Sequence, residues 1–155
     1  KPKKLVRPQA IEKNSASKGE AKFSSDLVAK TNDLVPNTSE RVNLAATALR
    51  RGDPHGAFDI CREMLKLDPF DASALNLAGV AAFQVGLTEE ALELLETAVL
   101  QSPLNAEVHT NLGNVYAKLG RESAAKMAYE QAMKVDSSYT EAFFNFGVFW
   151  SSKLM

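Results

Sequence analysis

The chain has 155 residues, of which 45% are apolar and 24% are charged, and its formal net charge is −1. This length is enough for one ordinary domain, and the near-neutral charge excludes the strongly basic proteins that bind nucleic-acid phosphates, so we expect no nucleic-acid partner. Cys61 is the only cysteine, which excludes an internal disulfide and a cysteine-based metal cluster.

The N-terminal segment is basic and has little helical periodicity. Residues 1–37 hold eight Lys or Arg against four Asp or Glu, which predicts an extended or disordered segment with one short helix over 23–34. A solubilising linker explains its charge, and the alternative is contact with an acidic partner or a membrane surface. Because the chain begins at Lys1, an upstream signal or membrane anchor stays open, as do cytoplasmic and bacterial periplasmic locations. We expect membrane contact only through this segment or such an anchor.

From residue 38 onward the sequence repeats with a period of 34 residues. A glycine and an alanine keep this spacing in every full copy, at Gly52, Gly86 and Gly120 and at Ala57, Ala91 and Ala125. Such a fixed period indicates a stacked repeat architecture. The predicted repeat domain, 38–155, consists of the full copies 38–71, 72–105 and 106–139 and the partial copy 140–155.

Each copy has the pattern of two helices, which predicts an all-α fold. In the third copy, apolar residues recur at three-to-four spacing over 107–119 and again over 122–135. Gly120 is expected to end the first helix, because glycine accepts the left-handed backbone found there. Gly113 and Ala125 are expected where the two helices cross, since larger side chains would push the backbones apart.

The third copy, AEVHTNLGNVYAKLGRESAAKMAYEQAMKVD, closely resembles the tetratricopeptide repeat, as does ASALNLAGVAAFQVGLTEEALELLETAVLQSP in the second. The aromatic residue that is usual early in the first helix is replaced by Arg41, Leu75 and His109, and it returns as Phe143. The resemblance implies a right-handed superhelix of antiparallel helix pairs, with three full repeats and a terminal single helix. It also implies that the first helices line an inner groove.

The resemblance assigns groove positions by register, and asparagine is common among them. The sixth position of the first helix is asparagine in three of four copies, at Asn43, Asn111 and Asn145. A side-chain amide offers both a donor and an acceptor, so a row of amides can pair with the backbone of an extended peptide. Stabilisation of the helix pair by Asn111 and Asn114 is the alternative. The predicted groove residues are Asn43, Asn76, Leu77, Thr110, Asn111, Asn114, Lys118, Phe144, Asn145 and Val148.

One kind of peptide can be argued against. Members of the family that clamp a terminal carboxylate, as chaperone adaptors do, use lysine and arginine on the inner face. The corresponding positions here are Val42, Ala46, Leu77, Glu107 and Asn111. The clamp charges are absent and Glu107 would repel a carboxylate, so we expect no binding of chaperone tails.

The last helix is rich in aromatic residues. Phe143, Phe146 and Trp150 share a face that is expected to cover the second helix of the third repeat. Phe149 is expected to point toward the place of an absent partner helix. Phe149 and Trp150 thus form a predicted second interface, and either the chain continues past Met155 or this helix self-associates or docks on a partner.

The sequence contains no recognisable catalytic or metal-binding motif. Catalysis needs convergent polar groups, whereas Cys61 and His109 are expected to be packed, and no phosphate loop, HExxH or paired cysteines occur. We therefore expect no catalytic residues, no metal and no cofactor. The function expected is a non-catalytic scaffold that binds a protein or extended peptide within a multiprotein assembly. Alternatives are a substrate-presenting part of a longer bacterial transferase, or an envelope pilus or secretion-machine assembly factor.

Overall fold

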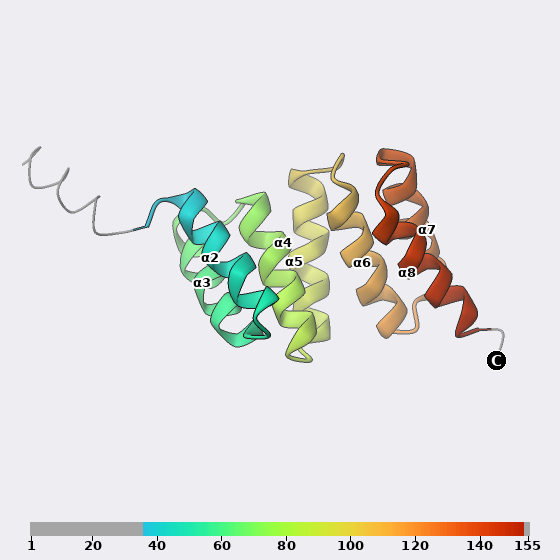
Figure 1. Ribbon diagram of the computed structural model, residues 1–155, viewed down its shortest axis with the longest axis horizontal. Helices are drawn as coiled ribbons and strands as arrows, with labels where there is room; N and C mark the ends of the chain where they lie inside the picture. Colours follow the sequence, from blue (N-terminus) through green and yellow to red (C-terminus); the bar gives the residue numbers. More distant parts are fainter. Residues whose placement is uncertain (1–35, 154–155) are drawn as a thin grey trace, which may run out of the picture. The chain divides into compact units, whose positions relative to one another are not determined.

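The computed structural model of the protein describes residues 36–153, in which all regular structure is α-helical (Figure 1). Residues 1–35, which hold nearly all of the predicted N-terminal segment and its short helix, lie outside the described part, as do residues 154–155. The helices of the described part are α2 (Thr38–Arg50), α3 (Pro54–Leu67), α4 (Ala72–Gln84), α5 (Thr88–Gln101), α6 (Ala106–Lys118), α7 (Glu122–Val135) and α8 (Thr140–Ser151).

The helices form a right-handed superhelix of antiparallel pairs, as the sequence predicts. The pairs are α2 with α3, α4 with α5 and α6 with α7, and α8 packs on α6 and α7 (Figure 1). The first helices α2, α4, α6 and α8 approach one another in turn, whereas the backbones of the second helices α3, α5 and α7 do not. The first helices therefore lie on the concave side of the array and the second helices on the convex side.

The helix boundaries follow from local capping chemistry. At the start of α2, Asn37 Oδ1 accepts from the amide of Glu40 at 2.9 Å, and Glu40 Oε2 accepts from the amide of Asn37 at 3.0 Å. Gly52, Gly86 and Gly120 follow the first helices with φ of 77°, 89° and 69°, in the left-handed region that favours glycine. The prediction for Gly120 is confirmed, and this chemistry explains why glycine recurs every 34 residues.

The helices of a pair approach most closely at a glycine of the first helix. A Cβ atom on Gly79 would lie 2.5 Å from Leu95 Cγ, and one on Gly113 would lie 2.7 Å from Tyr129 Cε1. The predicted close approach at Gly113 is confirmed, although the residue that faces it is Tyr129 rather than Ala125. These glycines let the second helix place one large side chain in contact with the backbone of the first.

Helix α8 packs on α7 through a different face from the one predicted. The rings of Phe146 and Phe149 lie 5.8 and 5.9 Å from the ring of Tyr129, and Phe149 is only 7% exposed. The expectation that Phe149 points outward is therefore wrong. Phe143 and Trp150 are 49% and 43% exposed, so of the three residues predicted to cover α7 only Phe146 packs against that helix's aromatic core.

The reason is the rotation of α8 about its own axis. Ala142, Phe146 and Phe149 lie on one face at three-to-four spacing and turn toward α7, which buries Ala142 and Phe149. Phe143 and Trp150 each come one residue later than a member of this set, about 100° farther round the helix. None of the helices between residues 36 and 153 has the length and apolar character that a membrane span requires.

Candidate functional site

A network of amide and carboxylate side chains links α4 and α6 on the concave face. Asn76 Nδ2 donates to Glu107 Oε1 at 2.8 Å, and Asn111 Nδ2 donates to Asn76 Oδ1 at 2.9 Å. Asn76 is buried, whereas Asn111 is half-buried and its Oδ1 accepts no hydrogen bond among the described residues. This cluster both holds the two helices together and leaves the carbonyl of Asn111 available on the concave face.

Thr110 does not line the groove, which corrects its predicted role. The residue is fully buried, and its hydroxyl donates to the carbonyl of Ala106 at 2.8 Å. In each repeat, the fifth residue of the first helix faces the first helix of the following repeat. The hydrogen bond between Asn76 of α4 and Asn111 of α6 shows this arrangement. Because α8 follows α6, the same position at Thr110 is closed, whereas Phe144 at the fifth position of α8 is 70% exposed.

Asn114 is tied to the second helix of its own repeat. The hydroxyl of Tyr129 donates to Asn114 Oδ1 at 2.7 Å, and burial raises the pKa of this phenol to about 12. Tyr129 therefore stays a neutral donor at physiological pH. Asn114 has a structural role through its oxygen, as the alternative interpretation holds, and its Nδ2 donates no hydrogen bond among the described residues.

Next to Asn114 the concave face contains a hollow of about 440 Å³ at the C-terminal half of the array. We call it the concave hollow, and it is lined by Phe83, Asn114, Ala117, Lys118, Tyr129, Asn145, Val148, Phe149, Ser152 and Lys153. Apolar groups thus lie beside two amides and two lysines, a combination typical of ligand sites in which a few polar groups orient a largely apolar ligand.

The two lysines of the hollow differ in their partners. Lys153 Nζ lies 2.5 Å from Glu122 Oε1 and 5.9 Å from the centre of the Phe149 ring, so its charge is largely compensated. Lys118 is exposed and forms no ion pair within residues 36–153. The concave hollow therefore presents one uncompensated positive charge, which favours an acidic group on a ligand.

The predicted groove residues separate into three sets. Asn114, Lys118, Asn145 and Val148 meet at the concave hollow. Asn76 and Asn111 meet in the amide cluster next to it. The remaining members lie apart: Asn43 is exposed on α2, Leu77 packs half-buried against the α2–α3 core, Thr110 is buried in α6, and Phe144 is exposed on α8.

Several residues of the concave hollow are not among the groove residues predicted from the sequence, and they include Tyr129 and Lys153. Tyr129 belongs to a second helix and reaches the concave side because Gly113 has no side chain in its way. The signal that could have found Tyr129 is a large residue facing the glycine that recurs every 34 residues in the first helices. Lys153 follows the end of α8, beyond the positions that the repeat register assigns to the groove.

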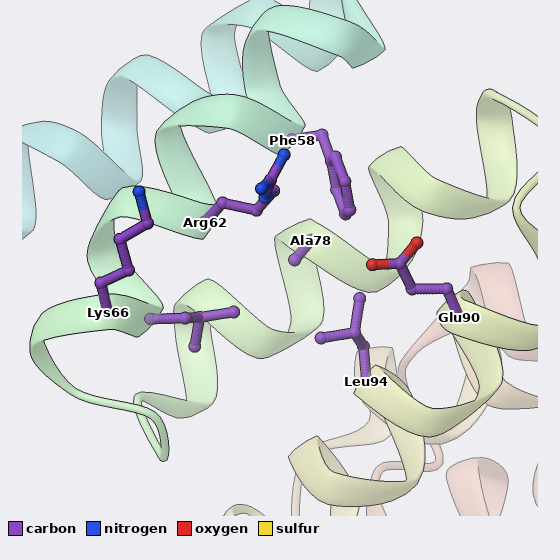
Figure 2. A pocket seen from close by; sticks show the side chains of 7 residues that line it. Phe58, Arg62, Lys66, Ala78, Glu90 and Leu94 are labelled. Carbon is purple, nitrogen blue, oxygen red and sulfur yellow. The ribbon is translucent and has the colours of Figure 1, made fainter.

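A second hollow, of about 280 Å³, lies between the outer helices α3 and α5 (Figure 2). Figure 2 shows Phe58 and Leu94 on opposite sides of it, with Ala78 at its floor. The hollow exists because Ala78 occupies the register position that Leu112 fills in the next repeat.

The basic groups at this outer hollow are neutralised within their own helix. Arg62 approaches Asp59 at 4.0 Å and lies 5.9 Å from the centre of the Phe58 ring, while Lys66 pairs with Glu63 at 2.5 Å. The outer hollow therefore lacks the uncompensated positive charge and the amides of the concave hollow, and its charged group without an ion pair among residues 36–153 is the carboxylate of Glu90. The concave hollow is the stronger candidate. Among residues 36–153, no group of three or more His, Cys, Asp or Glu side chains could hold a metal ion.

The fold defines a helical repeat protein in which stacked hairpins form an extended concave surface. The profile of the tetratricopeptide repeat matches residues 48–110 and 82–143, which together span more than half of the chain. The chain belongs to the tetratricopeptide repeat family.

Similar proteins span several functions. Over 108 residues the chain is 32% identical to a probable UDP-N-acetylglucosamine–peptide N-acetylglucosaminyltransferase SPINDLY from Hordeum vulgare, a match that covers 65% of this chain and 11% of that protein. The chain thus spans about a tenth of the length of this curated relative.

Two solved structures show the same fold. The crystal structure of MamA has a TM-score of 0.67 and 24% identity, and the match covers 92% of this chain and 86% of that one. The first tetratricopeptide domain of Spaghetti (RPAP3), solved bound to the HSP90 peptide SRMEEVD, has a TM-score of 0.66 and 16% identity. That match covers 74% of this chain and 91% of the other. At these identities the likeness concerns the fold alone.

Proposed function

We propose that the protein is a non-catalytic scaffold that binds an extended peptide segment of a partner protein along its concave face. The observation that carries the proposal is the concave hollow of about 440 Å³, in which apolar walls, two amides and the uncompensated Lys118 meet. At this volume the hollow fits a short stretch of an extended peptide rather than a folded domain. The neighbouring amides supply contacts to a peptide backbone.

The polar groups that remain available define the peptide's chemistry. Asn111 Oδ1 can accept from a peptide N–H, and Asn114 Nδ2 can donate to a peptide carbonyl, because their other atoms are engaged within the protein. Each such hydrogen bond contributes only about 0.5–1.5 kcal/mol, so several are needed together with the apolar contact. We therefore infer a ligand with one large apolar residue and an acidic residue close enough to reach Lys118.

Peptide binding by this fold has a solved precedent in the Spaghetti domain with its HSP90 peptide. For the present chain we propose an internal extended segment rather than a chain terminus. The groove positions that would have to hold a terminal carboxylate include Glu107, and its carboxylate is already oriented by Asn76. A second carboxylate beside Glu107 would be repelled.

Binding of a defined peptide panel tests the proposal. The panel contains 12-residue peptides with one Leu or Phe and one Asp at varied spacing, and control peptides in which Lys replaces Asp. Val148→Asp introduces a carboxylate into the concave hollow at a residue that is 54% exposed, so the fold is retained. We expect acidic peptides to bind the wild type and to lose at least tenfold in affinity with this variant.

The matched control is Met127→Asp on α7, an equally drastic change at a residue that is 69% exposed and does not line the hollow. It should bind the panel as the wild type does. Equal affinity of Val148→Asp and Met127→Asp for every peptide that binds would contradict the proposal.

A second candidate function is supported by the sequence match to the SPINDLY transferase. In that case this region would present a peptide substrate to a catalytic domain elsewhere in a longer protein. The same hollow would be used, so Val148→Asp in the full-length protein would lower the rate of peptide modification without affecting the catalytic domain. The predicted role in an envelope machine and the predicted membrane contact of the basic segment are not addressed by residues 36–153.

A further inference from the structure

The outer hollow between α3 and α5 lies where the array lacks one large side chain. Ala78 of α4 and Leu112 of α6 hold the same repeat position, and Leu112 is 7% exposed within the core that α4, α5 and α6 share. The shorter side chain of Ala78 leaves this space unfilled, which gives the hollow its volume of about 280 Å³. A leucine side chain therefore fills the corresponding space in the next repeat of the same array.

The walls of the outer hollow are apolar and come from both outer helices. Phe58 and Leu65 of α3 and Leu94 of α5 line it, and each is half-buried and packed against the core. Figure 2 shows Phe58 and Leu94 facing each other across the space. A ligand side chain placed between them would remove apolar surface from water on both sides, which favours binding.

The uncompensated charge at the rim of the outer hollow is negative. Glu90 of α5 is exposed and forms no ion pair within residues 36–153, and Figure 2 shows its carboxylate turned toward the space between the two apolar walls. The two basic residues of the lining already lie beside acids of their own helix. Helix α5 adds to the negative charge, because it contains four glutamates and no Lys or Arg. The outer hollow therefore favours a basic group on a ligand, the opposite of the concave hollow.

We propose that the outer hollow is a second docking site, which binds a segment of a partner protein that carries a leucine-sized apolar residue close to a Lys or Arg. The apolar residue enters between Phe58 and Leu94 and occupies the space that Leu112 fills in the next repeat. The basic residue pairs with Glu90 at the rim. This site is independent of the concave hollow, with which it shares no lining residue.

A second copy of this chain does not supply such a segment from the part that the structure describes. Among the exposed large apolar residues between 36 and 153, those with a basic neighbour in the sequence are Leu67 and Met127, each of which follows a lysine. Both lysines already pair with a glutamate of their own helix. Outside the described part, the sequence KKLVR at residues 3–7 has the required composition, so the experiment includes a variant of that stretch.

Basic peptides test the proposal directly. The probe is a fluorescein-labelled 12-residue peptide with one Leu and one Lys, at the spacing in the panel that binds most tightly. Its binding to the full chain is followed by fluorescence anisotropy. We expect saturable binding that weakens at least tenfold when Ser replaces the Leu of the peptide.

Two variants of the chain locate the binding, and a third is their control. Ala78→Leu fills the hollow from its floor, so it should weaken binding at least tenfold while circular dichroism shows the helices intact. Glu90→Lys reverses the charge at an exposed residue of the rim, so the fold is retained and binding should weaken at least fivefold. The control is Glu93→Lys, at an exposed glutamate of α5 that has no ion pair within residues 36–153 and does not line the hollow. Its effect should stay below twofold.

The remaining outcomes separate this site from its alternatives. Absence of saturable binding by every basic peptide, or equal losses with Glu90→Lys and Glu93→Lys, would overturn the proposal. The acidic peptides of the concave site should bind Ala78→Leu as they bind the wild type, and a parallel loss of both ligands would contradict two separate sites. Leu5→Ser should leave binding of the probe unchanged, and tighter binding by this variant would assign the outer hollow to residues 3–7 and so overturn the partner assignment.

Discussion

The hydroxyl of Tyr129 on the outer helix α7 donates a 2.7 Å hydrogen bond to Asn114 Oδ1 on the inner helix α6, passing Gly113 to reach it. This contact joins the core of the third repeat to the wall of the concave hollow. It fixes which end of the Asn114 amide faces a ligand. Stability and binding are therefore coupled at this pair of residues.

Tyr129→Phe should destabilise the protein by about 1 kcal/mol, because it removes one hydrogen bond to a partly buried amide. The free energy of unfolding in urea, measured by circular dichroism, checks this value. Tyr116→Phe is the matched control, since its hydroxyl bonds to the exposed Glu96, and its effect should be about 0.5 kcal/mol or less. Equal losses for the two variants would contradict a special role of the Tyr129 contact.

Gly113→Ala and Gly147→Ala should change stability in opposite directions. A methyl group at Gly113 meets the Tyr129 ring at 2.7 Å, so overpacking should cost about 1–3 kcal/mol. Gly147 lies in a helix with open space around its Cβ position, so alanine should stabilise by up to about 1 kcal/mol through helix propensity. Thermal unfolding of both variants checks the signs, and a destabilised Gly147→Ala would contradict the open space at this position.

Cys61 should resist alkylation in the native state. Its thiol is fully buried, and burial, with a smaller contribution from Asp71, raises its pKa to about 11. Iodoacetamide at pH 8 should therefore react only at the rate at which the protein opens, and rapidly in denaturant. Fast modification of the folded chain, followed by mass spectrometry, would contradict this burial.

The same thiol should make the free energy of unfolding depend on pH in the alkaline range. Because the folded state binds the Cys61 proton more tightly than the unfolded state does, its contribution is complete below the unfolded pKa near 9.0 and is lost as pH rises toward 11. The difference in unfolding free energy between the wild type and Cys61→Ala should thus fall between pH 9 and 11. A difference that stays constant over this range would contradict the raised pKa.

Self-association through α8 stays a prediction, and the burial of Phe149 changes how it is tested. Phe149→Glu would place a charge against Tyr129 and unfold α8, so it cannot report on an interface. Trp150→Ser alters an exposed ring instead. If the wild type forms dimers, light scattering should show this variant shifted toward the monomer. A wild type that stays monomeric at every concentration would contradict self-association.

The repeat, its helix pairs and the glycine turns could be predicted from the sequence because each signal recurs in register. A left-handed glycine such as Gly120 and a crossing glycine such as Gly113 follow from backbone geometry alone. Local chemistry decides these features. They do not depend on how one repeat is rotated against the next.

The orientation of α8 and the status of Thr110 depend on that rotation, and the predictions failed there. Helix α8 is apolar on several sides, so its periodicity did not distinguish the face with Phe149 from the face with Trp150. Thr110 is closed by the helix that follows it, while Phe144 at the same register is open. Of the lining of the concave hollow, Asn114, Lys118, Asn145 and Val148 follow from the repeat register, whereas Tyr129 on a second helix and Phe149 on the misjudged face of α8 do not.

The most direct test of the peptide-binding account is an NMR titration of the side-chain and backbone amide signals of the ¹⁵N-labelled chain with an acidic peptide from the panel that binds. The account predicts that the NH₂ resonances of Asn111, Asn114 and Asn145 shift together and saturate with the peptide, while signals from α3 and α5 near the outer hollow stay in place. Saturable binding that leaves these three amides unchanged and shifts residues of the outer hollow would contradict it.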